Sequence, residues 1–535
     1  MSNASEVQDL GPVIGIESGR IEGLSLDGVD AFKNIPFGAD TGGANRFRPP
    51  QPAPAWNGVR ATLEFGPRAP QDPNRVDNLK GGFETVMSED CLNLNVWRPS
   101  SANGGAASGM PVMVYIHGGG FLYGSANHIA HDGGILARRG NMVVVSINYR
   151  LGVLGLLSHP CLRDPDTGYD GNWGFLDQIA ALQWVNRNIA AFGGDADNVT
   201  IVGLSAGGGS VGAHCICPTS RPLFRRAVVQ SSSPLPTPRA DHDAATATLL
   251  AELDVAAELT ALQAVDRDAI QAAQAGWTAE LGAKDGLVHI AELQNGRTAP
   301  RPMVDGELLP YWPDEAMAAG LMDGLDLWVS HTRDEATVFA MNMAPDTIPR
   351  NDAQLRAILA KAGLDGDCLI PAYRNARQAR GEAADTWALW IAMHTDRLIR
   401  VPSINFLADH AKHGNNAWAC MVTRECDWVP PVPGDKALGA CHVVDLPFMF
   451  GSLHATPELQ RLVGSTPGAD ALAEIIQDAY IAFCHTGSPV TDKLSAWQPY
   501  DGEKRSTMLL GDDLLALDDP MGVERQLMTA ALADA

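Results

Sequence analysis

Several apolar runs mark the positions of buried strands along this chain. Residues 112–116 are all apolar, and residues 142–147 are interrupted by a single serine. The runs 199–202, 227–230 and 325–330 are similar, with one or two polar positions. Runs of this kind are typical of strands covered on both faces, which occur mostly in parallel sheets. We therefore expect these five segments to form the centre of a sheet.

Other segments have different periodicities. Residues 176–189 place apolar side chains three or four positions apart, which predicts an amphipathic helix. Residues 12–17, 19–24 and 29–35 are short strand-like runs separated by glycines, as in a meander, and residues 92–97 alternate as a strand does. Buried strands that alternate with helices indicate an α/β fold with a mostly parallel sheet.

Two long blocks have helical patterns. Residues 240–320 are acidic and rich in alanine, and residues 350–412 are also mostly helical in pattern. The chain of 535 residues is longer than a usual domain, but neither an internal repeat nor a low-complexity linker divides it. We expect residues 1–535 to form a single domain in which the two blocks are helical insertions on the sheet.

Composition and charge exclude some classes of protein. Hydrophobic residues at 45% and charged residues at 19% are typical of a soluble globular protein. The net charge of −24 excludes nucleic-acid binding, because phosphates would be repelled. The chain has no run of 18 uncharged apolar residues, so we expect no membrane span.

The N-terminus and the cysteines bear on the compartment. Residues 1–10 lack the basic and apolar regions of a signal peptide, and the nine cysteines follow no disulfide spacing. We expect reduced thiols and a cytoplasmic protein, or a secreted or periplasmic one if a leader has been removed.

One turn carries candidate chemistry. The run 199–202 leads into Gly203, Ser205 and Gly207, which have the spacing G-x-S-x-G. A sharp turn from strand to helix brings backbone against backbone, so that glycines are needed on both sides of a serine whose hydroxyl is lifted clear of the sheet. The pentapeptide alone also fits an ordinary tight turn.

Several further motifs agree with the catalytic interpretation. In chain order they are residues 88–96, 148–152, 171–178 with Trp184, 192–195, 497–500 and 519–520. With these motifs the chain resembles the type-B carboxylesterase family, which includes bacterial p-nitrobenzyl esterases, animal carboxylesterases and cholinesterases. The resemblance implies an α/β-hydrolase fold, with helices flanking a mostly parallel sheet, and a triad in the order serine, acid, histidine.

The resemblance assigns the triad to Ser205, Glu335 and His442. The residues alone do not decide whether Asp334 or Glu335 is the acid of the triad. Glu335 could instead be a carboxylate at a helix N-terminus, where the helix dipole favours a negative charge. Six histidines follow Glu335, and the segment around His442 resembles the histidine loop of the family. We interpret Asp445, three residues later, as a loop or capping residue.

A second glycine run supplies the expected oxyanion hole. Residues 118–120 are three glycines, which allow the backbone to turn its amides inward. The resemblance assigns the donors to the N–H groups of Gly119, Gly120 and Ala206. A phosphate-binding loop would instead need a following Gly-Lys-Ser/Thr, which is not present here.

The chain departs from the family pattern near the site. Leu204 stands where the family usually has an acid, and residues 67–91 lack the tryptophan with which cholinesterases bind a cation. Val443 replaces a family glycine, and we expect Phe121, Leu204 and Val443 to line the substrate pocket. Cys91 matches a family half-cystine whose partner position is Ala69, so we expect no disulfide there.

These observations predict a serine hydrolase that cleaves small-molecule carboxylic esters through an acyl-enzyme. We expect no cofactor and no metal site, because His128 and His131 lack a partner acid in a recognised spacing. One alternative is an amide or carbamate hydrolase with the same triad. The other is a non-catalytic binding protein like the neuroligins of this family.

Overall fold

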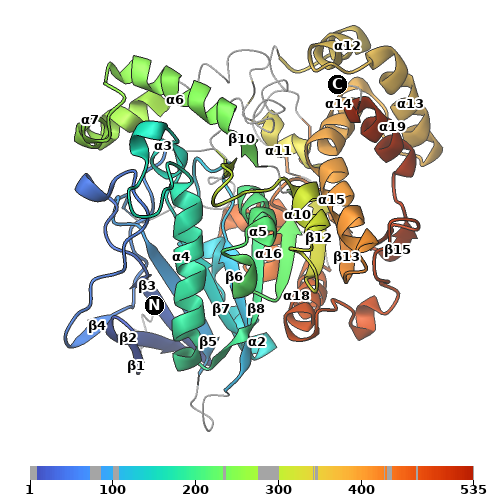
Figure 1. The fold of residues 1–535 in the computed structure, drawn as a ribbon. Helices are drawn as coiled ribbons and strands as arrows, with labels where there is room; N and C mark the ends of the chain where they lie inside the picture. The colour runs from blue at the N-terminus through green and yellow to red at the C-terminus, as the bar shows by residue number, and fades with distance from the viewer. Residues whose placement is uncertain are drawn as a thin grey trace, which may run out of the picture.

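A large mixed sheet forms the centre of the molecule (Figure 1). The computed structural model describes residues 9–72, 86–100, 108–232, 236–274, 301–341, 343, 347–426, 428–429, 436–464 and 468–533. Within these residues the main sheet has 13 strands in the order β1-β2-β3-β5-β7-β6-β8-β9-β12-β13-β14-β15, with β4 paired to β2. The α/β expectation is therefore confirmed.

The N-terminal strands pair antiparallel and form one edge of the sheet. They are β1 (Asp9–Ile16), β2 (Gly19–Leu26), β3 (Val29–Pro36) and β5 (Asn93–Pro99), with β4 (Val59–Ala61) beside β2. This arrangement is the meander that the glycine-separated runs predicted.

The central strands are parallel from β7 to β14. They are β7 (Val143–Ile147), β6 (Met110–Ile116), β8 (Gly194–Leu204), β9 (Arg226–Gln230), β12 (Asp326–Thr332), β13 (Ala417–Val422) and β14 (Ser506–Leu510), after which β15 (Leu514–Asp518) turns back antiparallel. All residues of β6, β7 and β9 are buried, as their apolar runs predicted. All residues of β13 are buried too, although this strand was not among the predicted ones.

Alternate residues of a central strand belong to different hydrophobic clusters. In β6, Val112 and Val114 pack in one cluster, whereas Met113 and Tyr115 pack in another. Side chains alternate between the two faces of a strand, so the two clusters lie on opposite faces of the sheet.

Helices supply the other half of each cluster. The first cluster contains side chains of α4 (Trp173–Asn188), α5 (Ala206–Ile216) and α15 (Val401–Lys412). The second contains side chains of α2 (Gly134–Gly140), α16 (Asp445–Phe450) and α18 (Ala469–Thr486). The sheet is thus covered on both faces.

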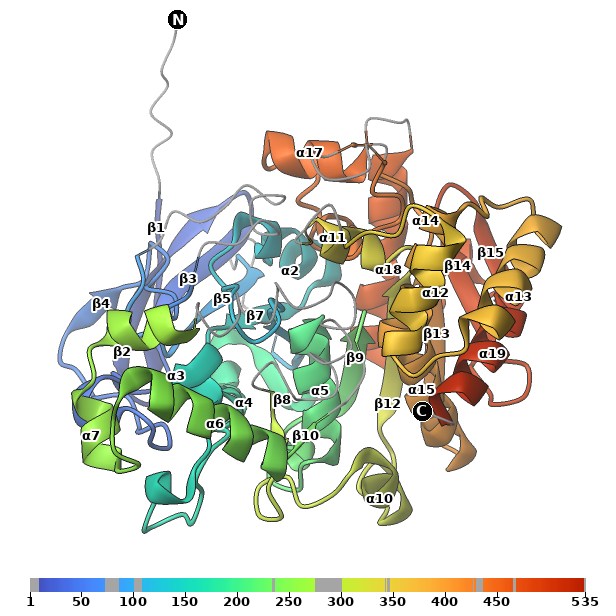
Figure 2. The same ribbon diagram turned by 90° about the horizontal axis from the view of Figure 1, so that it is seen from above.

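The helices of the two expected blocks lie mostly on opposite sides of the molecule, as Figure 2 shows from above, but residues 313–318 of the first block contact α15, in the second. The first holds α6 (Arg239–Leu253), α7 (Leu259–Ala264) and α10 (Pro313–Ala318), and the second holds α12 (Asp352–Lys361), α13 (Gly366–Ala379), α14 (Thr386–Thr395) and the π-helical turn η7 (Asp396–Arg400), which continues into α15.

The first block is less helical than its pattern predicted. Residues 301–312 are not helical, and Met303–Val304 (β11) pairs instead with Thr237–Pro238 (β10) in a separate two-stranded sheet. Residues 275–300 of this block lie outside the described residues.

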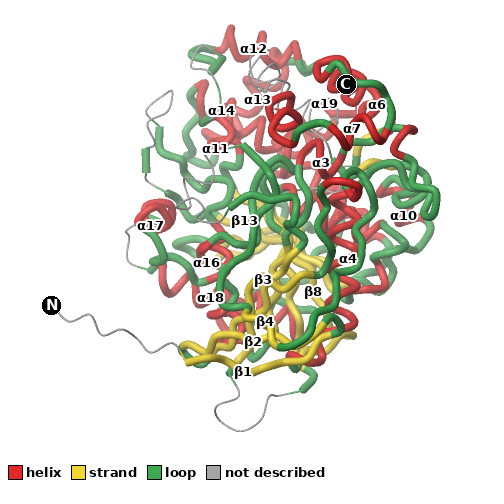
Figure 3. Tube along the Cα trace, turned by 90° about the vertical axis from the view of Figure 1, so that its left-hand side faces the viewer, coloured by secondary structure: helices red, strands yellow, loops and turns green. Residues whose placement is uncertain are grey.

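The remaining helices are short, except for the C-terminal one. They are α3 (Gly152–Leu156), α11 (Ala336–Ala340), α17 (Pro457–Val463) and α19 (Gly522–Ala533). Figure 3 shows α19 near α12, α13 and α14, at the opposite end of the molecule from β1. Among the helices of the described residues, none combines the length and the apolar character needed to cross a bilayer.

Candidate active site

Ser205 occupies the sharp turn between β8 and α5. Its backbone has φ 58° and ψ −122°, a region that non-glycine residues adopt only under strain. A Cβ on Gly203 would lie 2.3 Å from the Gly207 carbonyl oxygen, and one on Gly207 would lie 2.0 Å from that of Ile116. Both glycines are therefore required by close backbone approach. The alternative of an ordinary tight turn does not account for this strain.

His442 and Glu335 lie side by side, although they follow different strands. Glu335 follows β12 in the chain, and His442 follows β13. Nδ1 of His442 is 2.6 Å from Oε2 of Glu335, and both side chains are buried. A carboxylate can only accept, so Nδ1 carries the proton of this contact and Nε2 is left free to accept one. This arrangement suits a histidine that acts as a general base.

Several contacts keep Glu335 ionised in spite of its burial. Burial favours the neutral acid, but the charge and hydrogen bond of His442 and a 2.6 Å hydrogen bond from the Thr332 N–H lower the pKa of Glu335 overall. The hydroxyl of Ser231 lowers it further. An ionised Glu335 can hold the imidazole in one tautomer and stabilise the imidazolium.

Asp334 points to a different partner. Its Oδ2 accepts hydrogen bonds from the Ala440 N–H at 2.9 Å and from Arg333. The structure therefore brings Glu335, and not Asp334, to the ring of His442.

Other histidines after Glu335 have different surroundings. His394 and His410 are buried in helices, where their rings contact backbone carbonyl oxygens. His485 contacts the Gly140 carbonyl oxygen, and His454 pairs with Asp470 on the surface, where both side chains are exposed.

The glycine run follows β6 and packs against the turn of Ser205. A Cβ on Gly118 would lie 2.5 Å from the Leu204 carbonyl oxygen and 3.0 Å from Cβ of Ser205. Gly119 and Gly120 have φ values of +119° and +60°, which glycine adopts readily. Ala206 begins α5, and the first N–H groups of a helix have no partner within it. The three predicted donors thus belong to segments that meet at Ser205.

Tyr149 anchors the residue before the glycine run, and its neighbour Arg150 makes a buried ion pair. The Tyr149 hydroxyl donates to the His117 carbonyl oxygen at 2.8 Å, and the two rings stack. Arg150 forms a buried ion pair with Asp177 at 2.6 Å. Two of the motifs that carried the family resemblance therefore have structural roles beside the site.

The three predicted pocket residues are all buried. Phe121 adopts φ 59°, and its carbonyl oxygen accepts from the Gly152 N–H at 2.6 Å. Leu204 and Val443 belong to the same hydrophobic cluster. The backbone of Val443 has φ 72°, which is strained for a β-branched residue. No charged side chain occupies any of these positions.

Sequence reasoning missed three residues beside the triad. Gln230 ends β9, where its carbonyl oxygen accepts from the Ser205 N–H at 2.9 Å. Ser231 follows with φ 48°. The ring of Phe339 lies 4.9 Å from that of His442. Gln230 could have been noticed as the last residue of a predicted core strand. That position points to the site only once β9 is known to lie beside β8.

Asp445 is not the loop or capping residue that we expected. It is the first residue of α16, is 3% exposed, and accepts from Nε2 of Gln230 at 3.0 Å. Burial, and then the negative charge of Glu335, raise the pKa of Asp445 to about 6. Its buried position follows from packing α16 on the sheet.

In the part of the chain that the structure describes, no three His, Cys, Asp or Glu side chains converge as metal ligands would. Cys91 is a buried thiol, and burial raises its pKa.

Comparison with known proteins identifies the family. The carboxylesterase family matches residues 11–526. The chain belongs to this family. Para-nitrobenzyl esterase from Bacillus subtilis (strain 168) is 32% identical over 522 residues, which cover 96% of this chain and 98% of that protein. A solved structure of PNB esterase has a TM-score of 0.80 at 31% identity and covers 96% of this chain and 99% of its own.

A second relative lies in the animal branch. Cholinesterase from Mus musculus is 30% identical over 509 residues, 89% of this chain and 79% of that protein. The carboxylesterase membership confirms the resemblance found in the sequence, including the α/β-hydrolase fold. The chain is thus a serine hydrolase of the class that cleaves carboxylic esters.

Proposed function

We propose that Ser205, His442 and Glu335 form the triad of this carboxylesterase and cleave small uncharged esters through an acyl-enzyme. The observation that carries the proposal is the 2.6 Å contact between His442 and the buried Glu335. It is supported by the strained turn of Ser205, which is partly exposed and packs against the glycine run.

In the first half-reaction, Oγ of Ser205 attacks the ester carbonyl carbon while Nε2 of His442 takes the hydroxyl proton. Negative charge moves to the carbonyl oxygen, where the N–H groups of Gly119, Gly120 and Ala206 stabilise it. Glu335 stabilises the imidazolium. The bond to the alcohol oxygen then breaks, and His442 gives its proton to the departing alcohol.

In the second half-reaction, water attacks the acyl-enzyme and His442 takes one of its protons. The second tetrahedral intermediate is stabilised by the same N–H groups. It collapses to the free acid as His442 returns the proton to Oγ of Ser205. Fixed donors at this position are worth on the order of a hundredfold or more in rate each.

The apolar character of Phe121, Leu204 and Val443 supports an uncharged substrate. These residues offer no charge that would balance an ionic ester beside Ser205. A desolvated and unpaired charge is costly in such surroundings.

The test is labelling with a fluorophosphonate probe together with turnover of a series of p-nitrophenyl esters. We expect the probe on the peptide that contains Ser205, and loss of both labelling and turnover in Ser205→Ala. Ser210→Ala is the matched control, because Ser210 lies on α5 and bonds Gln178 instead of the triad. Glu335→Gln should lower kcat by orders of magnitude.

Two results would refute the proposal. One is a Ser205→Ala variant that still labels and turns over at the wild-type rate. The other is a wild-type protein that neither labels nor hydrolyses any ester of the series, as a neuroligin-like binding protein would behave. Faster cleavage of a matched amide than of its ester would favour amide hydrolysis by the same triad.

A further inference from the structure

We propose that Arg333 and Asp334 are positioning residues that clamp the histidine loop, residues 436–444, to the acid turn, residues 332–337. The clamp keeps His442 in line with Glu335. This inference rests on the proposed function, because it concerns the alignment of the proposed triad.

Asp334 and Ala440 are joined in both directions. The Asp334 N–H donates to the Ala440 carbonyl oxygen at 2.9 Å, and the Ala440 N–H donates to Oδ2 of Asp334, also at 2.9 Å. Ala440 stands two residues before His442, so this pair fixes the backbone that carries the ring. A Cβ on Gly439 would lie 2.6 Å from the same carboxylate oxygen, so the loop approaches Asp334 very closely.

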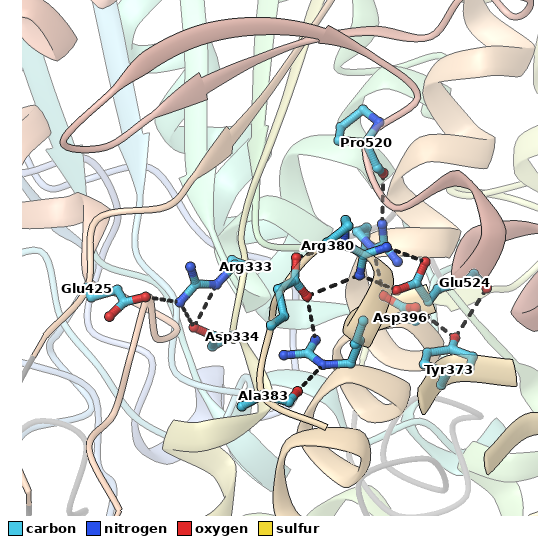
Figure 4. A network of polar contacts seen from close by, with 12 residues as sticks. Arg333, Asp334, Tyr373, Arg380, Ala383, Asp396, Glu425, Pro520 and Glu524 are labelled. Atoms are coloured by element: carbon cyan, nitrogen blue, oxygen red, sulfur yellow. Dashed lines mark hydrogen bonds and ion pairs between the residues drawn. The ribbon is translucent and has the colours of Figure 1, made fainter. Parts of the chain in front are cut away.

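Arg333 binds the same carboxylate oxygen of Asp334 as the Ala440 N–H does (Figure 4). Its Nε and Nη2 donate to Oδ2 of Asp334 at 3.1 and 2.8 Å, and Nη2 also reaches Oε1 of Glu425 at 2.6 Å. The backbone N–H of Arg333 donates to the carbonyl oxygen of Val422, at the end of β13, at 3.0 Å. Burial opposes the charge, but Asp334 and Glu425 raise the pKa of Arg333 overall.

Thr337 makes a parallel connection from the acid turn to the loop. Its hydroxyl lies 2.8 Å from the carbonyl oxygens of both Asp334 and Leu438. The acid turn and the histidine loop are therefore joined at Leu438, Ala440 and His442. The last of these contacts is the one between Glu335 and His442.

A neighbouring group in Figure 4 provides the control. Arg380 donates to Glu382 at 2.7 Å and pairs with Glu524 of α19. The side chain of Glu524 is buried. Arg380 is likewise an arginine shared by two carboxylates, but its hydrogen bonds go to Glu382 and Glu524 and not to the histidine loop. Its removal should lower stability without moving His442.

The physical reason for an effect on rate is alignment. A displacement on the order of 1 Å at reacting groups can cost about a hundredfold in rate. Loss of the Asp334 carboxylate removes the acceptor of the Ala440 N–H and one partner of Arg333. Of the connections described above, the loop then keeps the bond from the Asp334 N–H to the Ala440 carbonyl oxygen, the Thr337 hydroxyl and the Glu335–His442 contact. Substrate binding does not require the clamp, so kcat should fall while KM stays within about twofold.

The experiment compares kcat, KM, the rate of fluorophosphonate labelling and Tm in a set of variants. We expect Asp334→Ala to lower kcat and the labelling rate by about tenfold to a hundredfold. Asp334→Asn should recover most of kcat, because its carbonyl oxygen can still accept from Ala440. The loss of kcat in Arg333→Gln should be smaller than in Asp334→Ala. The double variant should lose no more kcat than the more impaired of the two single variants.

Arg380→Gln should lower Tm and leave kcat unchanged. If Asp334→Ala does not fold, Thr337→Val tests the same clamp and should lower kcat severalfold. The inference is overturned if these clamp variants keep wild-type kcat, if only KM changes, or if Arg380→Gln loses as much kcat. Failure of the proposed function is distinguishable, because then wild-type protein would not label on Ser205 or Glu335→Gln would keep full activity.

Discussion

Nε2 of Gln230 donates a 3.0 Å hydrogen bond to Oδ2 of Asp445, behind the proposed triad. The backbone of the same glutamine accepts from Ser205. One residue at the end of β9 thus contacts both the nucleophile turn and the helix that follows His442. The buried carboxyl at the other end of this contact has consequences for stability.

We predict that Asp445→Asn stabilises the protein at neutral pH. Between pH 4 and 6 the folded state binds more protons at Asp445 than the unfolded state, since the folded pKa is raised to about 6. Stability therefore falls as pH rises through this window, by roughly 3 kcal/mol in total. Tm of Asp445→Asn should exceed that of wild type at pH 7.5 and match it at pH 4. A gain in Tm confined to pH 4 would contradict this.

Acid should nevertheless destabilise the protein as a whole. Burial lowers the pKa of five histidines to between about 3 and about 4, namely His214, His242, His331, His394 and His410. Below pH 6.5 the unfolded chain takes up these protons and the folded chain does not, so stability falls as pH falls toward 4. Each histidine contributes up to about 3 kcal/mol, and together they outweigh Asp445.

The measurement for the histidines is Tm between pH 7 and pH 4.5. We expect a continuous decline and net proton uptake on unfolding near pH 5. A constant or rising Tm over this range would show that the histidines titrate normally in the folded state.

The glycine run offers a matched pair of substitutions. Gly119→Ala would place Cβ 2.0 Å from the Tyr123 carbonyl oxygen at φ +119°, so the loop must move. Gly120→Ala has open space around its Cβ and a φ of +60°, which costs about 1 kcal/mol in strain. Gly119→Ala should lower kcat about a hundredfold or more, and Gly120→Ala far less. Equal losses would argue against a shape-dependent oxyanion hole.

We predict faster hydrolysis of neutral esters than of choline esters. Leu204 supplies no anion beside Ser205, and residues 67–91 contain no tryptophan for a cation–π contact of roughly 0.5–2 kcal/mol. These absences should cost a choline ester about tenfold or more. The net charge of −24 attracts cations, but salt screens it beyond about 8–10 Å.

The comparison for this prediction is kcat/KM for butyrylcholine and for 3,3-dimethylbutyl butyrate, which has the same shape without the charge. Equal values, or faster cleavage of the choline ester, would reveal another acidic or aromatic group at the substrate.

Local patterns in the sequence determined the elements on which the site is built. The apolar runs predicted the buried strands β6, β7, β8, β9 and β12, and the spacing of Gly203, Ser205 and Gly207 predicted the sharp turn. Strand burial and turn geometry depend on neighbours a few residues away, so a sequence window contains the information. The motifs shared with relatives extended this to Glu335 and His442.

The tertiary structure decided which side chains meet. Adjacent carboxylates at Asp334 and Glu335 have nearly the same local sequence, and their partners, Ala440 and His442, lie more than 100 residues further along the chain. Gln230 and Asp445 are 215 residues apart, and they meet because β9 lies beside β8 while α16 packs on the same sheet. Strand order and helix packing set these contacts, because burial is shared between elements that are distant in the chain.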